Sequence, residues 1–393
     1  MVFIAKGVSS SLQRELDSFY KELTGSEFNI RSVTKGAFSQ ARAKLNPNAF
    51  KELNEVVVDT FYHEAPYLTW KGMRVLAVDG TTLALPNHSS VKEEFGEHGF
   101  GPKADSKKSL ARASLLYDPL NLLTLDAQID SFSTSEITLL YKHLEKADKK
   151  DLLLFDRLYA SLKLIFMLTA RGNEFCFRMQ KDWWLEVKNF TESSEQERIV
   201  KFKLPKKDWE ALSDYPEIRD KEIPCRLVKV QLPDGELEIL CTSLTDSEEY
   251  SIEDLAELYH LRWSEEEGYK LLKARIEVEN FSGKTAWAVK QDFYAKIFIM
   301  SLCADLAFPI EEKVRKEFRA DENRKHAQQI NHTSALAMTF DICIKVFIQK
   351  MIKQALEAFD DLIFRTREVV RPGRKVPRPK KKKRSYYMNY KPL

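Results

Sequence analysis

The spacing of apolar positions predicts helices before the first strand. Residues 1 to about 70 carry apolar side chains at helical spacing, with turns expected at Gly25 and at Asn46-Pro47. A continuous apolar run, "MRVLAVDG", then predicts a buried strand that ends on Asp79. Gly80 and Thr81 follow it and predict a turn, and "TLAL" (82–85) fits a short extension beyond that turn.

A second apolar strand is expected further along, at 151–155, and it ends just before Asp156. Between the two aspartates the pattern predicts two strands at 111–117 and 122–129, joined by the turn sequence "DPLN", and then a helix at 133–147. A further helix is expected after Asp156, to about residue 169. Ligands of open α/β sheets bind outside the carboxyl ends of strands, so two such aspartates in one sheet indicate a site.

From residue 174 the periodicity changes to short β-type runs: "EFCFRM", "WWLEV", "IVKFKL", "CRLVKV" and "LEILCTSL", with a hairpin at "PDG" (233–235). Helices return at 285–307 and 334–359. This order predicts an α/β core interrupted by a β-rich insertion, with helical N- and C-terminal regions. The expected divisions are 1–70 (helical, DNA-binding), 71–173 (first part of the catalytic core), 174–245 (β-rich insertion), 246–310 (second part of the core), 311–370 (helical) and 371–393 (basic tail).

The segment "YHLRWSEEEGYKLLK" (259–273) lies in a helix predicted from Ile252 to Arg275, with a capping box at Ser251. At about 100° per residue, one helical stripe holds Glu266 but neither of the glutamates beside it. The same stripe also carries Tyr259, Arg262 and Lys273. A helix face that carries both acidic and basic residues is typical of exposed salt bridges in solvent. The spacing alone does not distinguish that role from a functional one.

Charge is distributed unevenly along the 393 residues, of which 44% are hydrophobic and 31% charged. The tail, residues 371–393, contains ten Lys and Arg and no acidic residue. This leaves 52 basic against 59 acidic residues and a net charge of −7 for residues 1–370. Such a basic, proline-rich segment is typical of disordered chain that contacts polyanions, nucleic acid first, although a purely solubilising role fits too.

A second basic region at residues 31–51 has five basic residues and no acidic one. Ala37, Ala41 and Leu45 stand at helical spacing, with Arg42 and Lys44 beside them. This pattern fits either a DNA-facing helix or an ordinary surface helix. The N-terminal apolar run is too short for a signal peptide, and the five cysteines form no C-x-x-C pair, so we expect reduced thiols in a cytosolic protein.

Three carboxylates carry the candidate chemistry: Asp79, Asp156 and Glu266. Hard divalent cations prefer carboxylate oxygens, and two Mg²⁺ ions about 3.5–4 Å apart can clamp both reacting oxygens of a phosphodiester. Arg262 and Lys273 would then neutralise phosphates, and Tyr259 would hydrogen-bond or stack. The default role of Asp118, Asp126, Asp130, His98 and His260 is structural.

These residues resemble the DDE transposases of bacterial insertion sequences, in particular the insertion-sequence-four family. The resemblance rests on Asp79 in "VDGTTLAL", Asp156 in "FDRLYAS" and the Tyr-x2-Arg-x3-Glu-x6-Lys spacing of 259–273. It extends to "FSQARAKLNPNAF" near the N-terminus and to the "MNYKP" ending. The chain departs from the family pattern at Leu158, where a small residue is usual between the arginine and the aromatic residue.

The resemblance implies a ribonuclease H-like core and cut-and-paste transposition with Mg²⁺ or Mn²⁺, using Asp79, Asp156 and Glu266 as ligands. It implies double-stranded DNA as partner, at element ends and target, and a homodimer that holds both ends. The resemblance also implies that the protein is bacterial, cytoplasmic and associated with the nucleoid. Where relatives form a DNA hairpin, a tryptophan stacks on a displaced base, and the local candidates are Trp183, Trp184 and Trp209. The predicted DNA contacts are Tyr259, Arg262, Lys273, Arg157, Arg42 and Lys44.

Two other functions remain open from the residues. One is a DNA-binding protein derived from such an enzyme that no longer cleaves. The other is a two-carboxylate hydrolase acting on sugars, which the basic tail and the phosphate-suited Arg262 and Lys273 disfavour.

Overall fold

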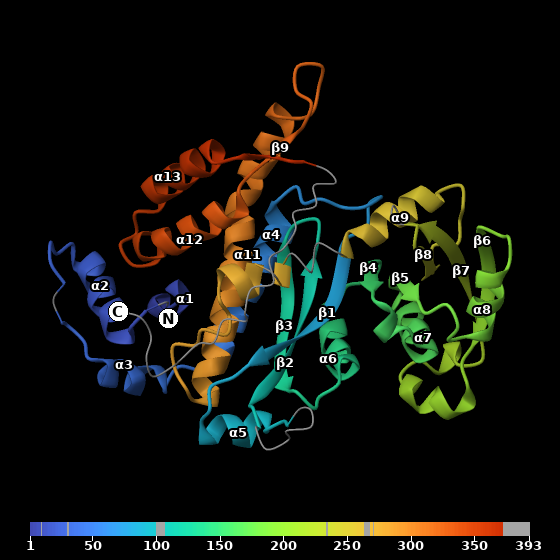
Figure 1. Ribbon diagram of the computed structural model, residues 1–393, viewed down its shortest axis with the longest axis horizontal. Coiled ribbons are helices and arrows are strands. Elements are labelled where there is room, and N and C mark those ends of the chain that lie inside the picture. Colours follow the sequence, from blue (N-terminus) through green and yellow to red (C-terminus); the bar gives the residue numbers. More distant parts are fainter. Residues whose placement is uncertain are drawn as a thin grey trace.

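One mixed sheet of eight strands crosses the computed structural model of the chain, in the order β3-β2-β1-β4-β5-β8-β7-β6 (Figure 1). The structure describes residues 1–8, 10–29, 31–99, 107–232, 235–262, 268–269 and 271–371. Central strands such as β4, "LLLF", are continuously apolar because helices cover both of their faces. The strands are β1 (Val75–Ala84), β2 (Leu110–Asp118), β3 (Leu123–Ser131), β4 (Leu152–Phe155), β5 (Glu174–Met179), β6 (Glu197–Lys203), β7 (Glu222–Gln231) and β8 (Leu237–Thr242), with a separate pair, β9 (Gln328–Gln329) and β10 (Glu368–Val369).

The helices begin at side-chain caps in several places, and the capping box predicted at Ser251 is confirmed, with Asp254 as its partner. The α-helices are α1 (Val2–Lys6), α2 (Leu12–Thr24), α3 (Lys35–Arg42), α4 (Asn48–Glu64), α5 (Ser89–Phe95), α6 (Glu136–His143), α7 (Leu162–Arg171), α8 (Leu185–Glu192), α9 (Ile252–His260), α11 (Ala286–Glu317), α12 (His332–Phe347) and α13 (Ile352–Arg365). Short 3₁₀ turns are η1 (Leu144–Lys146), η2 (Arg157–Tyr159), η3 (Lys206–Leu212) and η4 (Pro216–Ile218), and η5 (Leu271–Arg275) is a π turn.

Two layers of helices sandwich the part of the sheet around β1. Helix α6 packs on one face, where Leu140 joins the apolar cluster that includes Val78 and Leu116. Helices α9 and α11 lie on the other face, where Tyr259 packs near Ala77. Because side chains alternate between the faces of a strand, residue 79 points to the α9 face and residue 80 to the α6 face.

The long helix α11 runs through the centre of the molecule (Figure 1). By length and composition it could cross a membrane, but 72% of its most apolar window is buried inside the protein, as expected of a core helix. Pro309 lies within it.

Several predicted boundaries are wrong. Strand β1 does not end at Asp79: it continues to Ala84, because Gly80 and Thr81 pair with β2 instead of forming a turn. The run "WWLEV" is not a strand, since helix α8 begins at Leu185. Of the helix predicted from Ile252 to Arg275, α9 ends at His260, but Arg262, 268–269 and 271–275 are helical again, so the helix is interrupted rather than absent. The helix predicted at 334–359 is broken between α12 and α13.

The predicted β-rich insertion supplies β5 to β8, and these strands extend the same sheet: β5 runs parallel to β4, and β8 pairs with β5. The hairpin predicted at "PDG" (233–235) is confirmed by its flanks, since β7 and β8 pair antiparallel up to Gln231 and Leu237; residues 233–234 themselves lie outside the described residues. The predicted division of the chain into domains remains a prediction.

Candidate active site

The two strand-borne aspartates are neighbours in the sheet. Strands β1 and β4 are parallel, and their last paired residues are Val78 and Phe155, so Asp79 and Asp156 each follow directly after the pair. The backbone at Asp156 is still extended, with φ −72° and ψ 163°, which continues the side-chain alternation of β4. Both carboxylates therefore lie on the α9 face, as the sequence predicted for a shared site.

Each carboxylate is oriented by the peptide that follows it. Oδ1 of Asp79 accepts a hydrogen bond from the main-chain N–H of Gly80 at 2.8 Å, and Oδ1 of Asp156 accepts one from Arg157 N–H at 2.7 Å. Asp156 thereby caps the 3₁₀ turn η2. Arg157 itself is exposed, so its predicted contact with DNA stays a prediction.

Negative charge is concentrated at Asp79. Burial raises the pKa of Asp79 to about 6, and the nearby Glu136 and Asp156 carboxylates raise it as well. The Gly80 N–H and the Arg262 guanidinium act in the opposite direction. Asp79 and Asp156 lie on the same face of the sheet in a partly desolvated place, and a hard cation fits such a pair because it neutralises both; Glu136 lies on the opposite face and is paired with Arg112. Asp79 and Asp156 therefore suit two of the ligands of a divalent metal site.

Tyr259 and Arg262 lie on the α9 side of these aspartates and are buried, at 2% and 5% exposure. Tyr259 OH donates to the main-chain oxygen of Phe155 at 3.4 Å, and the Arg262 guanidinium lies 5.7 Å from the Tyr259 ring centre. Burial lowers the pKa of Arg262, but Tyr259 and the two aspartates outweigh it and raise that pKa. Both side chains are buried in this structure, and their predicted contacts with DNA stay a prediction.

Lys273, in the π turn η5, reaches strand β1. Its Nζ donates to Thr81 Oγ1 and to the main-chain oxygen of Thr82 at 3.1 Å. The stripe predicted for one continuous helix is therefore split between α9 and η5, yet both pieces converge near Asp79. Glu266 lies outside the described residues, and its role as third ligand stays a prediction. Within the ranges that the structure describes, no three His, Cys, Asp or Glu side chains form a metal-binding group.

Sequence reasoning missed a third carboxylate beside the site, Glu136. It is the first residue of α6 and is partly buried, paired with Arg112 and 3.3 Å from Tyr159 OH. A Cβ added at Gly80 would lie 2.5 Å from Glu136 Cδ. Any side chain at position 80 would therefore force the Glu136 side chain to move, because it occupies the space above Gly80. The only local signal was the N-cap serine at 135, which predicts a helix start and no function.

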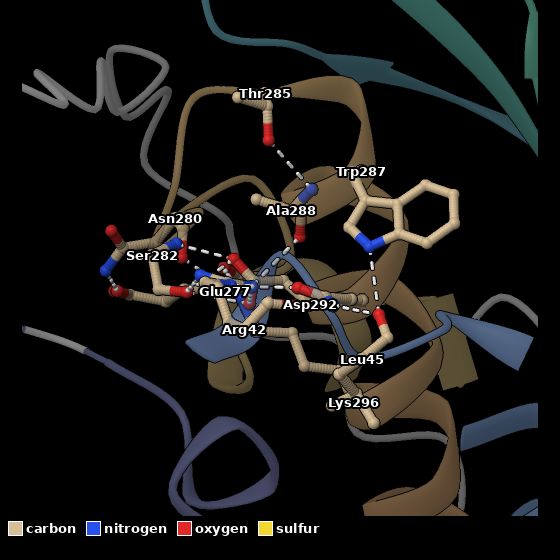
Figure 2. A network of polar contacts seen from close by, with 11 residues as sticks. Arg42, Leu45, Glu277, Asn280, Ser282, Thr285, Trp287, Ala288, Asp292 and Lys296 are labelled. Carbon is tan, nitrogen blue, oxygen red and sulfur yellow. Dashed lines mark hydrogen bonds and ion pairs between the residues drawn. The ribbon is translucent and has the colours of Figure 1, made fainter. Parts of the chain in front are cut away.

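Arg42, predicted to contact DNA, is a core residue instead (Figure 2). Its guanidinium bonds Asp292 Oδ1 at 3.0 Å, Gln291 Oε1 at 2.8 Å and Ser282 Oγ at 2.7 Å. Gln291 returns a hydrogen bond to the main-chain oxygen of Arg42 at 2.8 Å. These contacts join α3 to α11 and to the loop that follows η5, so the prediction for Arg42 is wrong.

The residues at helical spacing in this region do not share one environment. Ala37 and Ala41 are exposed in α3, Leu45 packs partly against the core, and Arg42 is buried. Burying the two alanine side chains would remove little apolar area from water. The hydrogen bonds of Arg42 to Gln291 and Asp292 on α11 therefore decide which face of α3 turns inward. Lys44 is exposed, so its predicted contact with DNA remains a prediction.

The predicted structural acids keep that role. Asp118 is buried between Tyr62 and Asn121, and Asp130 bonds Lys142 at 3.2 Å. Asp126 contacts His143, a residue that the sequence did not single out.

Comparison with known proteins identifies the family of the chain. Residues 70–303 match the transposase DDE domain family. The transposase InsG of insertion sequence element IS4 from Escherichia coli (strain K12) is 22% identical over 275 residues, which are 69% of this chain and 60% of InsG. The match thus spans less than two thirds of that relative.

Among solved structures, the cryo-EM structure of a piggyBac transposase synaptic complex with hairpin DNA aligns with 92% of this chain and 73% of that chain. Its identity is 11% and its TM-score 0.46, too low to establish a shared fold. The family match is the stronger finding, since it covers more than half of the chain and includes the strands that carry Asp79 and Asp156. The chain belongs to the transposase DDE domain family.

Proposed function

We propose that this protein is a metal-dependent DNA transposase that excises an insertion sequence and joins it to target DNA. The observation that carries the proposal is the register of β1 and β4, which sets Asp79 beside Asp156 within a chain of the transposase DDE domain family. The proposed substrate is double-stranded DNA, at the element's terminal inverted repeats and at the target.

Asp79 and Asp156 would hold Mg²⁺ or Mn²⁺, with Glu266 as the proposed third ligand. When bound, the ions would activate water at the element's end and stabilise the charge of the attacked phosphate. The chain's own part is to orient the carboxylates through Gly80 N–H and Arg157 N–H, and to balance their charge with Arg262. Hydrolysis would free a 3′ hydroxyl, which then attacks the other strand or the target.

The finer assignments belong to the same proposal. We infer a ribonuclease H-like core with the Tyr-Arg-Glu-Lys signature, and a homodimer that holds two element ends in the cytoplasm at the nucleoid. Of the three tryptophans considered for base stacking, Trp183 is 51% exposed. Trp184 packs against Phe202, and Trp209 donates to the main chain at Leu204. Exposure favours Trp183 as the stacking residue.

Cleavage of a labelled duplex that carries the element's end tests the proposal, with Mg²⁺ and with EDTA. We expect cleavage with the metal ion only, and its loss in Asp79→Asn and in Asp156→Asn. Asp130→Asn is the matched control, because that strand-end aspartate bonds Lys142 away from the site. DNA binding without cleavage under any metal condition would favour instead a derived DNA-binding protein.

A further inference from the structure

A chain of buried polar groups lies behind Asp79, on the α6 face of the sheet. Asp126 Oδ2 on β3 lies 2.7 Å from Nδ1 of His143, the last residue of α6. His143 Nε2 lies 3.0 Å from Ser114 Oγ on β2, and Ser114 Oγ donates to the main-chain oxygen of Asp79 at 3.1 Å. His143 and Ser114 have no exposed surface, and Asp126 is 5% exposed.

The donor and acceptor roles of the two His143 nitrogens depend on its tautomer, and the groups on either side constrain them. The His143 hydrogen bond helps to lower the pKa of Asp126 to about 2 against the effect of burial, so this carboxylate is an acceptor only. Nδ1 of His143 therefore donates to it. Ser114 has one hydroxyl proton, and it can serve Asp79 only if His143 Nε2 donates to Ser114.

The Asp79–Gly80 peptide, whose carbonyl accepts from Ser114, also orients the Asp79 carboxylate. The carbonyl of the Asp79–Gly80 peptide accepts from Ser114 on the α6 face and from Tyr269 OH at 2.6 Å. The N–H of the same peptide donates to Asp79 Oδ1 at 2.8 Å. Any group that holds the plane of this peptide thus also sets where the carboxylate points. The main-chain pairing of β1 with β4 stops at Val78, while its pairing with β2 continues to Ala84, so strand pairing supports the peptide from the β2 side only.

The order Asp-His-Ser is that of a hydrolytic triad, but the surroundings exclude such a role. The serine has no exposed surface, and its hydroxyl proton is directed at a main-chain oxygen. A nucleophile needs an accessible oxygen whose proton the histidine accepts. These hydrogen bonds are instead suited to holding the β1 backbone at Asp79 in place against the buried core.

We propose that Asp126, His143 and Ser114 form a positioning relay that holds the Asp79–Gly80 peptide, and with it the Asp79 carboxylate, in the orientation that binds a divalent cation. This inference rests on the proposed function, in which Asp79 is a metal ligand. Groups behind a ligand typically change metal affinity by about 10–100-fold when they are removed. Since this relay acts through one peptide with a second donor, Tyr269, we expect the lower end, about tenfold.

The test is a calorimetric titration of the full chain with Mn²⁺, without DNA. Ser114→Ala should bind Mn²⁺ about tenfold more weakly than the wild type. Tyr269→Phe removes the other donor to the same oxygen without touching the buried relay, and it should weaken binding similarly. His143→Gln keeps an N–H donor near Ser114 and should bind more tightly than His143→Leu. In cleavage assays, a high Mn²⁺ concentration should restore the rate of Ser114→Ala.

Ser301→Ala is the matched control. Ser301 is equally buried and donates to a main-chain oxygen, that of Thr124 at 3.5 Å, but it lies outside the relay. It should lose stability without any change in Mn²⁺ affinity. If Asp79→Asn lowers the affinity while Ser114→Ala and Tyr269→Phe do not, the relay is structural only and the inference is overturned. If Asp79→Asn leaves the affinity unchanged, the proposed metal site itself is wrong.

Discussion

Replacing Asp79 by asparagine should stabilise the metal-free protein at neutral pH. Asparagine keeps an oxygen that can accept the Gly80 N–H, but it carries no charge. In the folded wild type, burial raises the pKa of Asp79 to about 6, and Glu136 and Asp156 add to the increase. The charged carboxylate is therefore unfavourable in the folded state whenever no cation is bound.

The sign and size follow from linkage. Because the folded-state pKa is above the ordinary value of 3.8, the folded protein holds a proton that the unfolded chain has lost between about pH 4 and pH 6. Stability contributed by the protonated form is present below pH 4 and is lost as pH rises through 6. The pKa difference corresponds to at most about 3 kcal/mol at 1.36 kcal/mol per tenfold. Solvent at this partly exposed group reduces that ceiling, so we expect about 1–2 kcal/mol.

Urea unfolding in EDTA at pH 4.5 and pH 7.5 measures the effect. The stability advantage of Asp79→Asn over the wild type should be small at pH 4.5 and should reach its full size at pH 7.5. Asp130→Asn is a control of opposite sign, because the Ser131 N–H and Lys142 outweigh burial and lower the pKa of Asp130. An equal stability difference at both pH values would refute the electrostatic reasoning about Asp79.

Three further results are expected. Gly80→Ala should lower the free energy of unfolding in urea by about 1–3 kcal/mol, because its Cβ displaces Glu136 from Arg112. Adding Glu136→Ala should recover part of that loss, and no recovery would mean that the strain lies elsewhere. Glu266→Ala should abolish DNA cleavage with little effect on DNA binding, while Glu265→Ala and Glu267→Ala are mild; equal losses in all three would reject the helical-stripe argument. Deleting residues 371–393 should weaken binding to any duplex and flatten its salt dependence, by about 0.9 in log–log slope for each phosphate that the tail no longer neutralises, and an unchanged slope would return the tail to a solubilising role.

Strands β1 and β4, and the aspartates near their ends, could be predicted because short stretches of sequence mark them. Continuous apolar runs at 151–155 and before Asp79 predict buried strands, and both are confirmed. The end of β1 was wrong because Gly80 and Thr81 have turn chemistry, which the pairing with β2 overrides. A partner strand some thirty residues away is invisible to a local pattern.

The residues that the sequence misjudged depend on contacts across the chain. Arg42 meets Asp292 and Gln291 some 250 positions later, so nothing near it in the sequence marks it as buried. Glu136 is the first residue of a capped helix, an ordinary place for an acid, and only folding brings it over Gly80. His143 looked like any histidine at the end of a helix.

The charge count around Asp79 links the proposed metal site to the predicted stability of the metal-free protein. Asp79, Asp156 and Glu136 bring three negative charges, while Arg262 and Arg112 bring two positive ones. Glu266, if it joins them as predicted, adds a fourth negative charge. One divalent ion then neutralises the remaining two. The same burial that raises the pKa of Asp79 also strengthens its attraction to that ion, because both effects arise from weak screening by water. A substitution that relieves the repulsion should therefore gain stability and lose the metal ion together.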